Sequence, residues 1–376
     1  MSLPADGSVF SDADRHGCER GGAAREEAGV SRTAGATRFW VGASTMGRIG
    51  SAARGIRPLD VAADGTATLG EVVDVGPNPM FLTFSAATGV LGIVHELSSG
   101  LVSAWTIEDD AVLPFGDAGA TGAADPCHLS FNEAGDLIFA ANYSGSRLSV
   151  HPVRPAAEAE AVLIVDFEGS GPNRERQEAP HPHQAVLDTA RDRVLVPDLG
   201  ADRIRVLSLR DLPVALEHYD ADDIVVHAGA GPRHLVIDGD LALVANELDR
   251  TVSIVDLGAG REVAWVPVDE TVEPRGLGLS AIRLTRDGIV LVGDRDADAL
   301  SALRFDSDAQ TLAHLMSVPT GGRHPRDLQL THDERFALVA DQGSDSIAIV
   351  ALDHGVPTGV VGTVATPAPS CLARMP

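Results

Sequence analysis

The sequence predicts an all-β fold built from one repeated unit of four short strands, and three observations support this prediction. Glycine and proline are abundant, at 39 and 22 of 376 residues, while aromatic residues make up only 4%. Such a composition suits many short strands joined by turns. Apolar strands recur along most of the chain, and their spacing of about 50 residues is typical of the four-stranded blades of a β-propeller.

The repeat is clearest from Gly231 to Leu257, in GPRHLVIDGDLALVANELDRTVSIVDL. Related units begin at Gly76, Asp125, His181, Leu279 and His324. In every unit one polar residue closes an apolar strand, and these residues are His95, Asn142, Asp198, Asn246, Asp294 and Asp341. The next strand is expected to begin shortly afterwards, at Leu101, Arg147, Arg203, Thr251, Ala299 and Ser346. We expect the closing Asn and Asp residues to be structural, because short polar side chains bind turn backbone.

Six units are visible, and Phe39–Ser44 (FWVGAS) is interpreted as the remnant of a seventh. A lone four-stranded sheet cannot bury both of its faces, so the units must stack on one another. We therefore predict a seven-bladed β-propeller, with four-stranded antiparallel blades around a central channel. The ring is expected to close where the segment near Gly362–Thr366 joins the blade begun at Phe39. Two stacked β-sandwiches are a weaker alternative, since nothing in a sandwich demands this period.

Residues 1–37 are rich in Gly, Ala, Arg and Glu without periodicity, and they are predicted to be a disordered or extended lead-in. Residues 38–376 are predicted to form the single propeller domain. The three cysteines, Cys18, Cys127 and Cys371, are far apart and suggest neither a disulfide framework nor a zinc site. No secretory signal is visible near the N-terminus, so a cytoplasmic location is expected.

The charge of the chain narrows the classes of partner. The formal net charge is −25, and no lysine occurs, so all 29 basic residues are arginine. A field this negative argues against nucleic acid or an anionic membrane as partner, and no window of about 18 apolar residues predicts a membrane span. The missing lysine excludes Schiff-base chemistry. An anionic substrate would have to be held by locally gathered arginines. No cofactor is predicted.

The repeat also predicts where the functional site lies. The first strand of each blade lines the channel and the second runs antiparallel beside it, so the start of one and the end of the other meet at the same mouth. First strands begin at Cys127-His128, His181-Pro182-His183, Arg233-His234 and Arg326. One residue beyond the second strands stand Glu96, Tyr143, Leu199, Glu247, Arg295 and Gln342. These residues differ in charge from blade to blade, which favours one shared site over seven structural copies.

Several segments resemble a known family. NYSGSRLSV, RQEAPHPHQAVLD, GPRHLVID, ALVANEL and TGGRHPRDL are similar to segments of the bacterial 6-phosphogluconolactonase family of seven-bladed propellers, which is related to the fungal carboxymuconate-lactonizing enzymes. The resemblance covers roughly residues 38 to 372. It implies a catalytic group of His183 (from HPH), Arg233 (from GPRH), Glu247 (from NEL) and Arg295 (from GDRDAD). LSAIRL departs from the pattern of many members, which affects the expected substrate more than the fold.

The resemblance implies hydrolysis of a small anionic lactone, and these residue types suit that reaction. Lactone hydrolysis needs a base for water, a stabiliser for the oxyanion and an anchor for the anionic group. We assign Glu247 as general base or acid with His183 as its partner and Arg233 to the lactone carbonyl. Arg295 is assigned to the anionic tail, with Arg326 as a further candidate for the same role. Further substrate-binding candidates are His128, Tyr143, His181 and Arg326. As mouth residues, the candidates are expected to contribute little to core packing.

Three alternatives remain open. The same residues could serve a cyclase or isomerase that adds a carboxylate across a double bond. The propeller could be a non-catalytic binding module, although three Trp and two Tyr provide few residues for an apolar docking rim. A lactonase that uses Ca²⁺ would need several converging acidic or amide ligands. Glu96, Glu247 and the Asn and Asp residues that close the strands could contribute, but the arginines oppose cation binding. No metal ligand is therefore assigned, and a monomer or weak homo-oligomer is expected.

Overall fold

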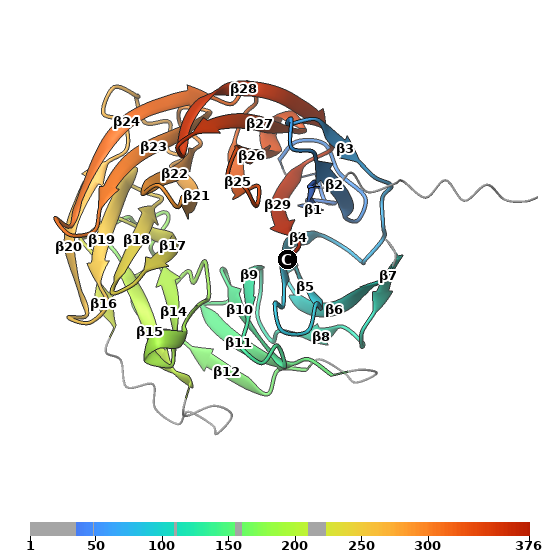
Figure 1. Cartoon of the computed structure of the whole chain (residues 1–376). Helices are drawn as coiled ribbons and strands as arrows, with labels where there is room; N and C mark the ends of the chain where they lie inside the picture. The colour runs from blue at the N-terminus through green and yellow to red at the C-terminus, as the bar shows by residue number, and fades with distance from the viewer. Residues whose placement is uncertain (1–34, 48, 109–110, 155–159, 210–222) are drawn as a thin grey trace, which may run out of the picture. The chain divides into compact units, whose positions relative to one another are not determined.

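Seven sheets of antiparallel strands form a ring in the computed structural model, which describes residues 35–47, 49–108, 111–154, 160–209 and 223–376 (Figure 1). Each sheet has four strands, which follow the sequence order in six of the seven sheets, and one sheet carries a short additional strand. The predicted seven-bladed propeller is therefore confirmed. The predicted lead-in, residues 1–37, lies almost entirely outside the described residues, apart from its last three positions.

The first three blades along the chain each contain four consecutive strands. Blade 1 contains β4 (Pro79–Phe84), β5 (Leu91–His95), β6 (Leu101–Glu108) and β7 (Ala111–Pro114), and β8 (Gly119–Ala120) pairs with β6. Blade 2 contains β9 (Pro126–Phe131), β10 (Leu137–Asn142), β11 (Arg147–Pro152) and β12 (Leu163–Asp166). Blade 3 contains β13 (Val186–Asp188), β14 (Arg193–Asp198), β15 (Arg203–Ser208) and β16 (Ile224–Val225), with the 3-10 turn η1 (Thr189–Arg191) between its first two strands.

The next three blades follow the same order. Blade 4 contains β17 (Pro232–Asp238), β18 (Leu241–Asn246), β19 (Thr251–Asp256) and β20 (Arg261–Pro267). Blade 5 contains β21 (Leu279–Leu284), β22 (Ile289–Asp294), β23 (Ala299–Asp306) and β24 (Thr311–Pro319). Blade 6 contains β25 (Pro325–Leu330), β26 (Phe336–Asp341), β27 (Ser346–Asp353) and β28 (Val356–Ala365), with η3 (Gln342–Ser344) before β27.

Blade 7 closes the ring with strands from both ends of the chain. Its order is β29 (Pro369–Arg374), β1 (Thr37–Ala43), β2 (Arg57–Val61) and β3 (Ala67–Leu69), and the red β29 lies beside the blue β1 in Figure 1. The predicted closing segment, Gly362–Thr366, was wrong, because Gly362 pairs with Ile349 of β27 as part of the outer strand of blade 6. The chain must leave that strand before it can return to the channel, so the closing strand begins at Pro369.

The core lies between blades rather than within one sheet. Seven apolar clusters occur among the described residues, each shared by two neighbouring blades. In β18, Leu241, Leu243 and Ala245 pack toward blade 5, while Ala242 and Val244 pack toward blade 3. Alternate side chains of a strand point to opposite faces, so one run of small and branched apolar residues serves two interfaces.

The strand ends agree with the predicted repeat. The second strands of blades 1 to 6 end at His95, Asn142, Asp198, Asn246, Asp294 and Asp341, and the third strands begin at the six predicted residues. The hairpin from β17 to β18 turns through Gly239-Asp240, and Gly239 has a φ of +57° that favours glycine. Within the described residues, no helix has the length and apolar character needed to cross a membrane.

Candidate active site

Two consecutive residues at the end of each second strand have different surroundings. The last strand residues form the strand-end ring, and none is more than 2% exposed: His95, Asn142, Asp198, Asn246, Asp294 and Asp341. The residues that follow form the mouth ring: Glu96, Tyr143, Leu199, Glu247, Arg295 and Gln342. All of the mouth ring except Leu199 lines one cavity of about 430 Å³. The fold therefore brings residues from five blades to the same opening.

Six of the eight residues predicted for the site line this cavity: Tyr143, His183, Arg233, Glu247, Arg295 and Arg326. Blades 2 to 6 supply them, either at the end of the second strand or at the start of the first. The shared mouth follows from the antiparallel pairing of these two strands in every blade.

Glu247 is the centre of a cluster of ion pairs. Its Oε2 lies 2.9 Å from Nε of Arg233 and 2.8 Å from Nη2 of Arg295, while its Oε1 accepts a hydrogen bond of 2.5 Å from Nη2 of Arg176. Glu247 is only 4% exposed, and burial alone would raise its pKa. Arg295, Arg233 and Arg176 outweigh burial, so the pKa of Glu247 falls well below its usual range.

Arg295 is held by the loop before β21. Its backbone N–H donates to Gly278 O (3.1 Å), and its Nη2 also donates to Leu279 O (2.8 Å). Gly278 has a φ of +67°, and a Cβ there would lie 1.7 Å from Glu247 O. Only glycine fits this close approach, which brings the loop that holds Arg295 against the backbone of Glu247.

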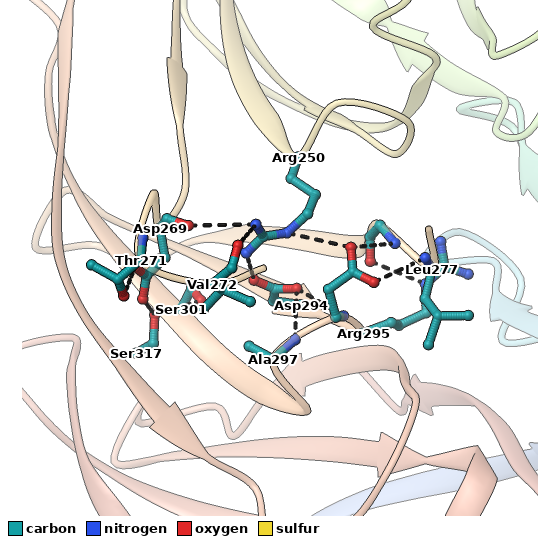
Figure 2. A network of polar contacts seen from close by, with 12 residues as sticks. Arg250, Asp269, Thr271, Val272, Leu277, Asp294, Arg295, Ala297, Ser301 and Ser317 are labelled. Carbon is teal, nitrogen blue, oxygen red and sulfur yellow. Dashed lines mark hydrogen bonds and ion pairs between the residues drawn. The ribbon is translucent and has the colours of Figure 1, made fainter. Parts of the chain in front are cut away.

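A buried ion-pair network joins the turn after Glu247 to the turn after Asp294 (Figure 2). Nη2 of Arg250 donates to Asp294 Oδ2 at 2.6 Å, and Nε of Arg250 lies 3.5 Å from Asp296 Oδ2. Asp296 in turn accepts backbone N–H groups of Arg275 and Leu277 (2.9 Å each). The network therefore fixes the loop that holds Arg295, although none of its carboxylates lines the cavity.

Arg233 is among the largest fully buried side chains of the described residues, at 2% exposed. Burial and the nearby Arg295 lower its pKa to about 9, although Glu247 opposes this shift. Nη1 of Arg233 donates to Nε2 of His234 at 3.3 Å. The expectation that mouth residues contribute little packing is wrong for Arg233, because its guanidinium is enclosed between its neighbours.

His183 lines the cavity with an uncharged imidazole. Burial and Arg233 hold the pKa of His183 well below its usual range. Its Nδ1 lies 3.7 Å from Sγ of Cys127, a thiol whose pKa is raised to about 12 by burial. None of the hydrogen bonds between described residues joins His183 to Glu247. The predicted partnership of these two side chains would therefore have to run through a bound water or substrate.

His128 and His181 do not line the cavity. The ring of His128 packs 4.1 Å from Phe81 and 5.6 Å from His234 (centroid distances). The ring of His181 stacks on Tyr143 at 4.4 Å. Cys127, the neighbour of His128 in β9, lines the cavity instead, as the alternation of side chains along a strand requires. These two histidines support the walls rather than face a substrate.

The remaining predicted residues, Arg326 and Tyr143, each contact another residue of the cavity lining. Nη2 of Arg326 donates to Glu96 Oε2 at 3.2 Å, and both side chains are about 15% exposed. The hydroxyl of Tyr143 accepts a hydrogen bond of 3.2 Å from Arg176, while burial and Glu247 raise the pKa of Tyr143.

Arg176 has no counterpart among the predicted residues. It lies on the connection from β12 to β13, outside the repeated unit, and its side chain is 36% exposed. The only signal in the sequence is its place five residues before His181, within the quoted segment RQEAPHPH. The contacts with Glu247 and Tyr143 make it part of the site.

The cavity lining carries four arginines, Arg176, Arg233, Arg295 and Arg326, against three carboxylates, Glu96, Asp125 and Glu247. It is therefore a locally cationic surface in a chain of net charge −25. Among the described residues, no group of three or more His, Cys, Asp or Glu side chains is arranged to hold a metal ion. Such a cavity can bind an anion and stabilise a developing oxyanion.

Residues 38–374 match the family model described as "Lactonase, 7-bladed beta-propeller". Similar sequences include the 6-phosphogluconolactonase of Bacillus subtilis (strain 168), which is 28% identical over 312 residues, 78% of this chain and 86% of that protein. The 6-phosphogluconolactonase of Yersinia pestis (strain Pestoides F) is 26% identical over 307 residues, 80% of this chain and 87% of that protein.

Solved structures show the same architecture. A Bacteroides fragilis protein has a TM-score of 0.79 and 27% identity, covering 92% of this chain and 99% of its own. The periplasmic gluconolactonase of Pseudomonas aeruginosa has a TM-score of 0.81 and 24% identity, covering 91% of this chain and 99% of its own. At that identity the second likeness supports the fold alone.

Proposed function

The chain belongs to the family of seven-bladed β-propeller lactonases, and we propose that it hydrolyses a small anionic lactone of the sugar-acid type. The relatives named 6-phosphogluconolactonase support this reaction class. The observation that carries the proposal is the cluster at the mouth: an uncharged His183 and four arginines share one cavity with a buried, ionised Glu247.

In the proposed reaction, His183 accepts a proton from water as the water oxygen attacks the lactone carbonyl carbon. Negative charge then develops on the carbonyl oxygen, where Arg233 can stabilise it. The bond from the carbonyl carbon to the ring oxygen breaks, and the ring oxygen takes the proton from His183 to become a hydroxyl. The product is the open-chain hydroxy acid, which loses its carboxyl proton to solvent.

Glu247 suits a different role from the general base assigned on the sequence. Both carboxylate oxygens of Glu247 already contact guanidinium groups, Oε2 at 2.9 and 2.8 Å and Oε1 at 2.5 Å, so neither is free to take a proton from water. Its contacts with Arg233, Arg295 and Arg176 instead favour a positioning role, in which one buried anion holds three guanidinium groups around the cavity. A cluster of arginines without this anion would repel itself.

The test is turnover by the purified protein of 6-phosphogluconolactone and, separately, of carboxymuconate, each with and without a chelator. Acid release above the spontaneous rate, unchanged by the chelator, is expected with the lactone. His183→Asn should abolish it, while the matched His128→Asn variant, altered outside the cavity, should retain it. Cyclisation of carboxymuconate without lactone hydrolysis would favour the isomerase, and binding without turnover would favour a binding module. Loss of lactone turnover in the chelator, with recovery of turnover when Ca²⁺ is added, would favour a metal-dependent lactonase.

A further inference from the structure

Arg176 reaches the cavity from a segment that belongs to no blade. Its Nη2 contacts Oε1 of Glu247 at 2.5 Å and the hydroxyl of Tyr143 at 3.2 Å. No hydrogen bond between described residues uses its Nε or Nη1, and the side chain is 36% exposed. Because Arg176 lines the cavity, these donors are available to a ligand there.

The backbone next to Arg176 is fixed by a buried glutamine. Gln177 is fully buried, and its Nε2 donates to Asp202 Oδ1 (2.6 Å) and Leu199 O (2.9 Å). Its Oε1 accepts the backbone N–H of Asn173 at 3.0 Å. The connection is thereby tied to blade 3, so Arg176 is presented at a defined position while its side chain keeps freedom at the mouth.

The other arginines of the cavity are more buried than Arg176, and their side chains contact other residues. Arg295 donates from Nε and Nη2 to two backbone carbonyls, and Arg233 is 2% exposed. Arg326 is 16% exposed and contacts Glu96. Arg176 is the most exposed of the four, and Glu247 would keep both Arg233 and Arg295 if Arg176 turned away. Moving Arg176 onto a ligand therefore leaves no buried charge unpaired.

We propose that Arg176 binds the anionic group of the substrate and determines the preference for an anionic over a neutral lactone. This inference rests on the proposed lactonase function. The anion, a phosphate or carboxylate remote from the lactone carbonyl, takes the exposed donors of Arg176, because a guanidinium offers paired N–H groups that match such an anion. Arg295, assigned to the anionic tail on the sequence, instead stays with Glu247 and the loop before β21.

The test compares 6-phosphogluconolactone with glucono-δ-lactone, which has the same ring without the phosphate. Arg176→Met should reduce the ratio of kcat/KM for the phosphorylated over the neutral lactone about 10- to 100-fold, mainly through KM, because a charge-assisted contact is lost. Arg176→Lys should restore part of the ratio. Arg174→Met is the matched control, since it removes an exposed arginine from the same connection that does not line the cavity, and it should leave the ratio within about twofold.

Inorganic phosphate provides a second readout that needs no turnover. Calorimetry should show phosphate binding to the wild type and to Arg174→Met, and at least tenfold weaker binding to Arg176→Met. An unchanged lactone ratio together with unchanged phosphate binding would overturn the inference, and so would an equal loss for both lactones. If the wild type hydrolyses neither lactone, the proposed function fails, but phosphate binding that depends on Arg176 would still support an anion site there.

Discussion

The residues of the strand-end ring and the mouth ring are adjacent in sequence, yet their side chains have different contacts. Strand-end residues turn into their own or the next blade: Asn246, for example, donates to hydroxyls of Thr251 and Ser253, at 2.8 and 2.7 Å. The mouth residue beside it, Glu247, instead contacts arginines from three different segments. A shift of one residue thus separates the residues that stabilise blades from those that face a ligand.

Burial has opposite outcomes for the pKa of two carboxyl groups of the strand-end ring and of Glu247 in the mouth ring. Burial raises the pKa of Asp341 to about 7, and no arginine offsets it. Burial also raises the pKa of Asp198, even though Arg205 partly offsets the effect. Glu247 is just as enclosed, but its three arginines lower its pKa. The difference teaches that burial alone does not identify the functional carboxylate. The feature that distinguishes Glu247 is the number of arginines that contact it.

The largest effect is expected from Glu247→Gln. The amide keeps the shape but removes the anion that holds the three arginines, so lactone turnover should fall about 1,000-fold. The unfolding free energy should fall by less than about 3 kcal/mol, because water and buffer anions in the cavity can screen the arginines. Stopped-flow acid release and urea unfolding measure the two quantities. A variant that keeps wild-type turnover while its unfolding free energy falls by more than about 3 kcal/mol would place Glu247 with the strand-end ring.

Asp294→Asn tests the strand-end ring. It removes the buried partner of Arg250, so the unfolding free energy should fall by about 3 kcal/mol, at the low end for a broken buried pair. Arg250 keeps contacts with Asp296 and with the carbonyls of Asp269 and Val272, which limits the loss. Urea unfolding measures it. The double variant Asp294→Asn/Arg250→Met is the control and should regain part of the stability, because no unpaired charge remains.

The difference between the strand-end ring and the mouth ring could largely be predicted from the sequence, because the repeat shows where the strands end. Thr251 begins its strand as predicted, and Glu247 and Arg295 line one cavity as predicted. Arg176 could not be predicted in this way, since the connection that carries it has no periodicity. The prediction that His128 binds substrate failed to take into account that side chains at the start of a first strand point alternately toward the cavity and away from it. The cytoplasmic location and the oligomeric state stay predictions.

Asp341→Asn gives a smaller effect that depends on pH. The folded pKa of about 7 lies above the value of about 3.9 expected in the unfolded chain. The folded state therefore binds more protons between these values, so the wild type should lose stability as the pH rises through this window. Urea unfolding near pH 5 and pH 8 should show a relative gain of about 2–3 kcal/mol for the variant at the higher pH. A constant difference between variant and wild type would mean that Asp341 is ionised in both states.

The smallest effect is expected from Tyr143→Phe, an uncharged change in the mouth ring. The variant loses only the hydroxyl that accepts a hydrogen bond from Arg176, while its ring can still stack on His181. Arg176 would keep its contact with Glu247, so only one of the two contacts that position it is lost, and we expect KM for the phosphorylated lactone to rise about two- to fivefold at constant kcat. Steady-state kinetics on both lactones shows whether KM or kcat changes. A 100-fold loss of kcat would mean that the Tyr143 hydroxyl transfers a proton, and Tyr143 would then act in the chemistry rather than position Arg176.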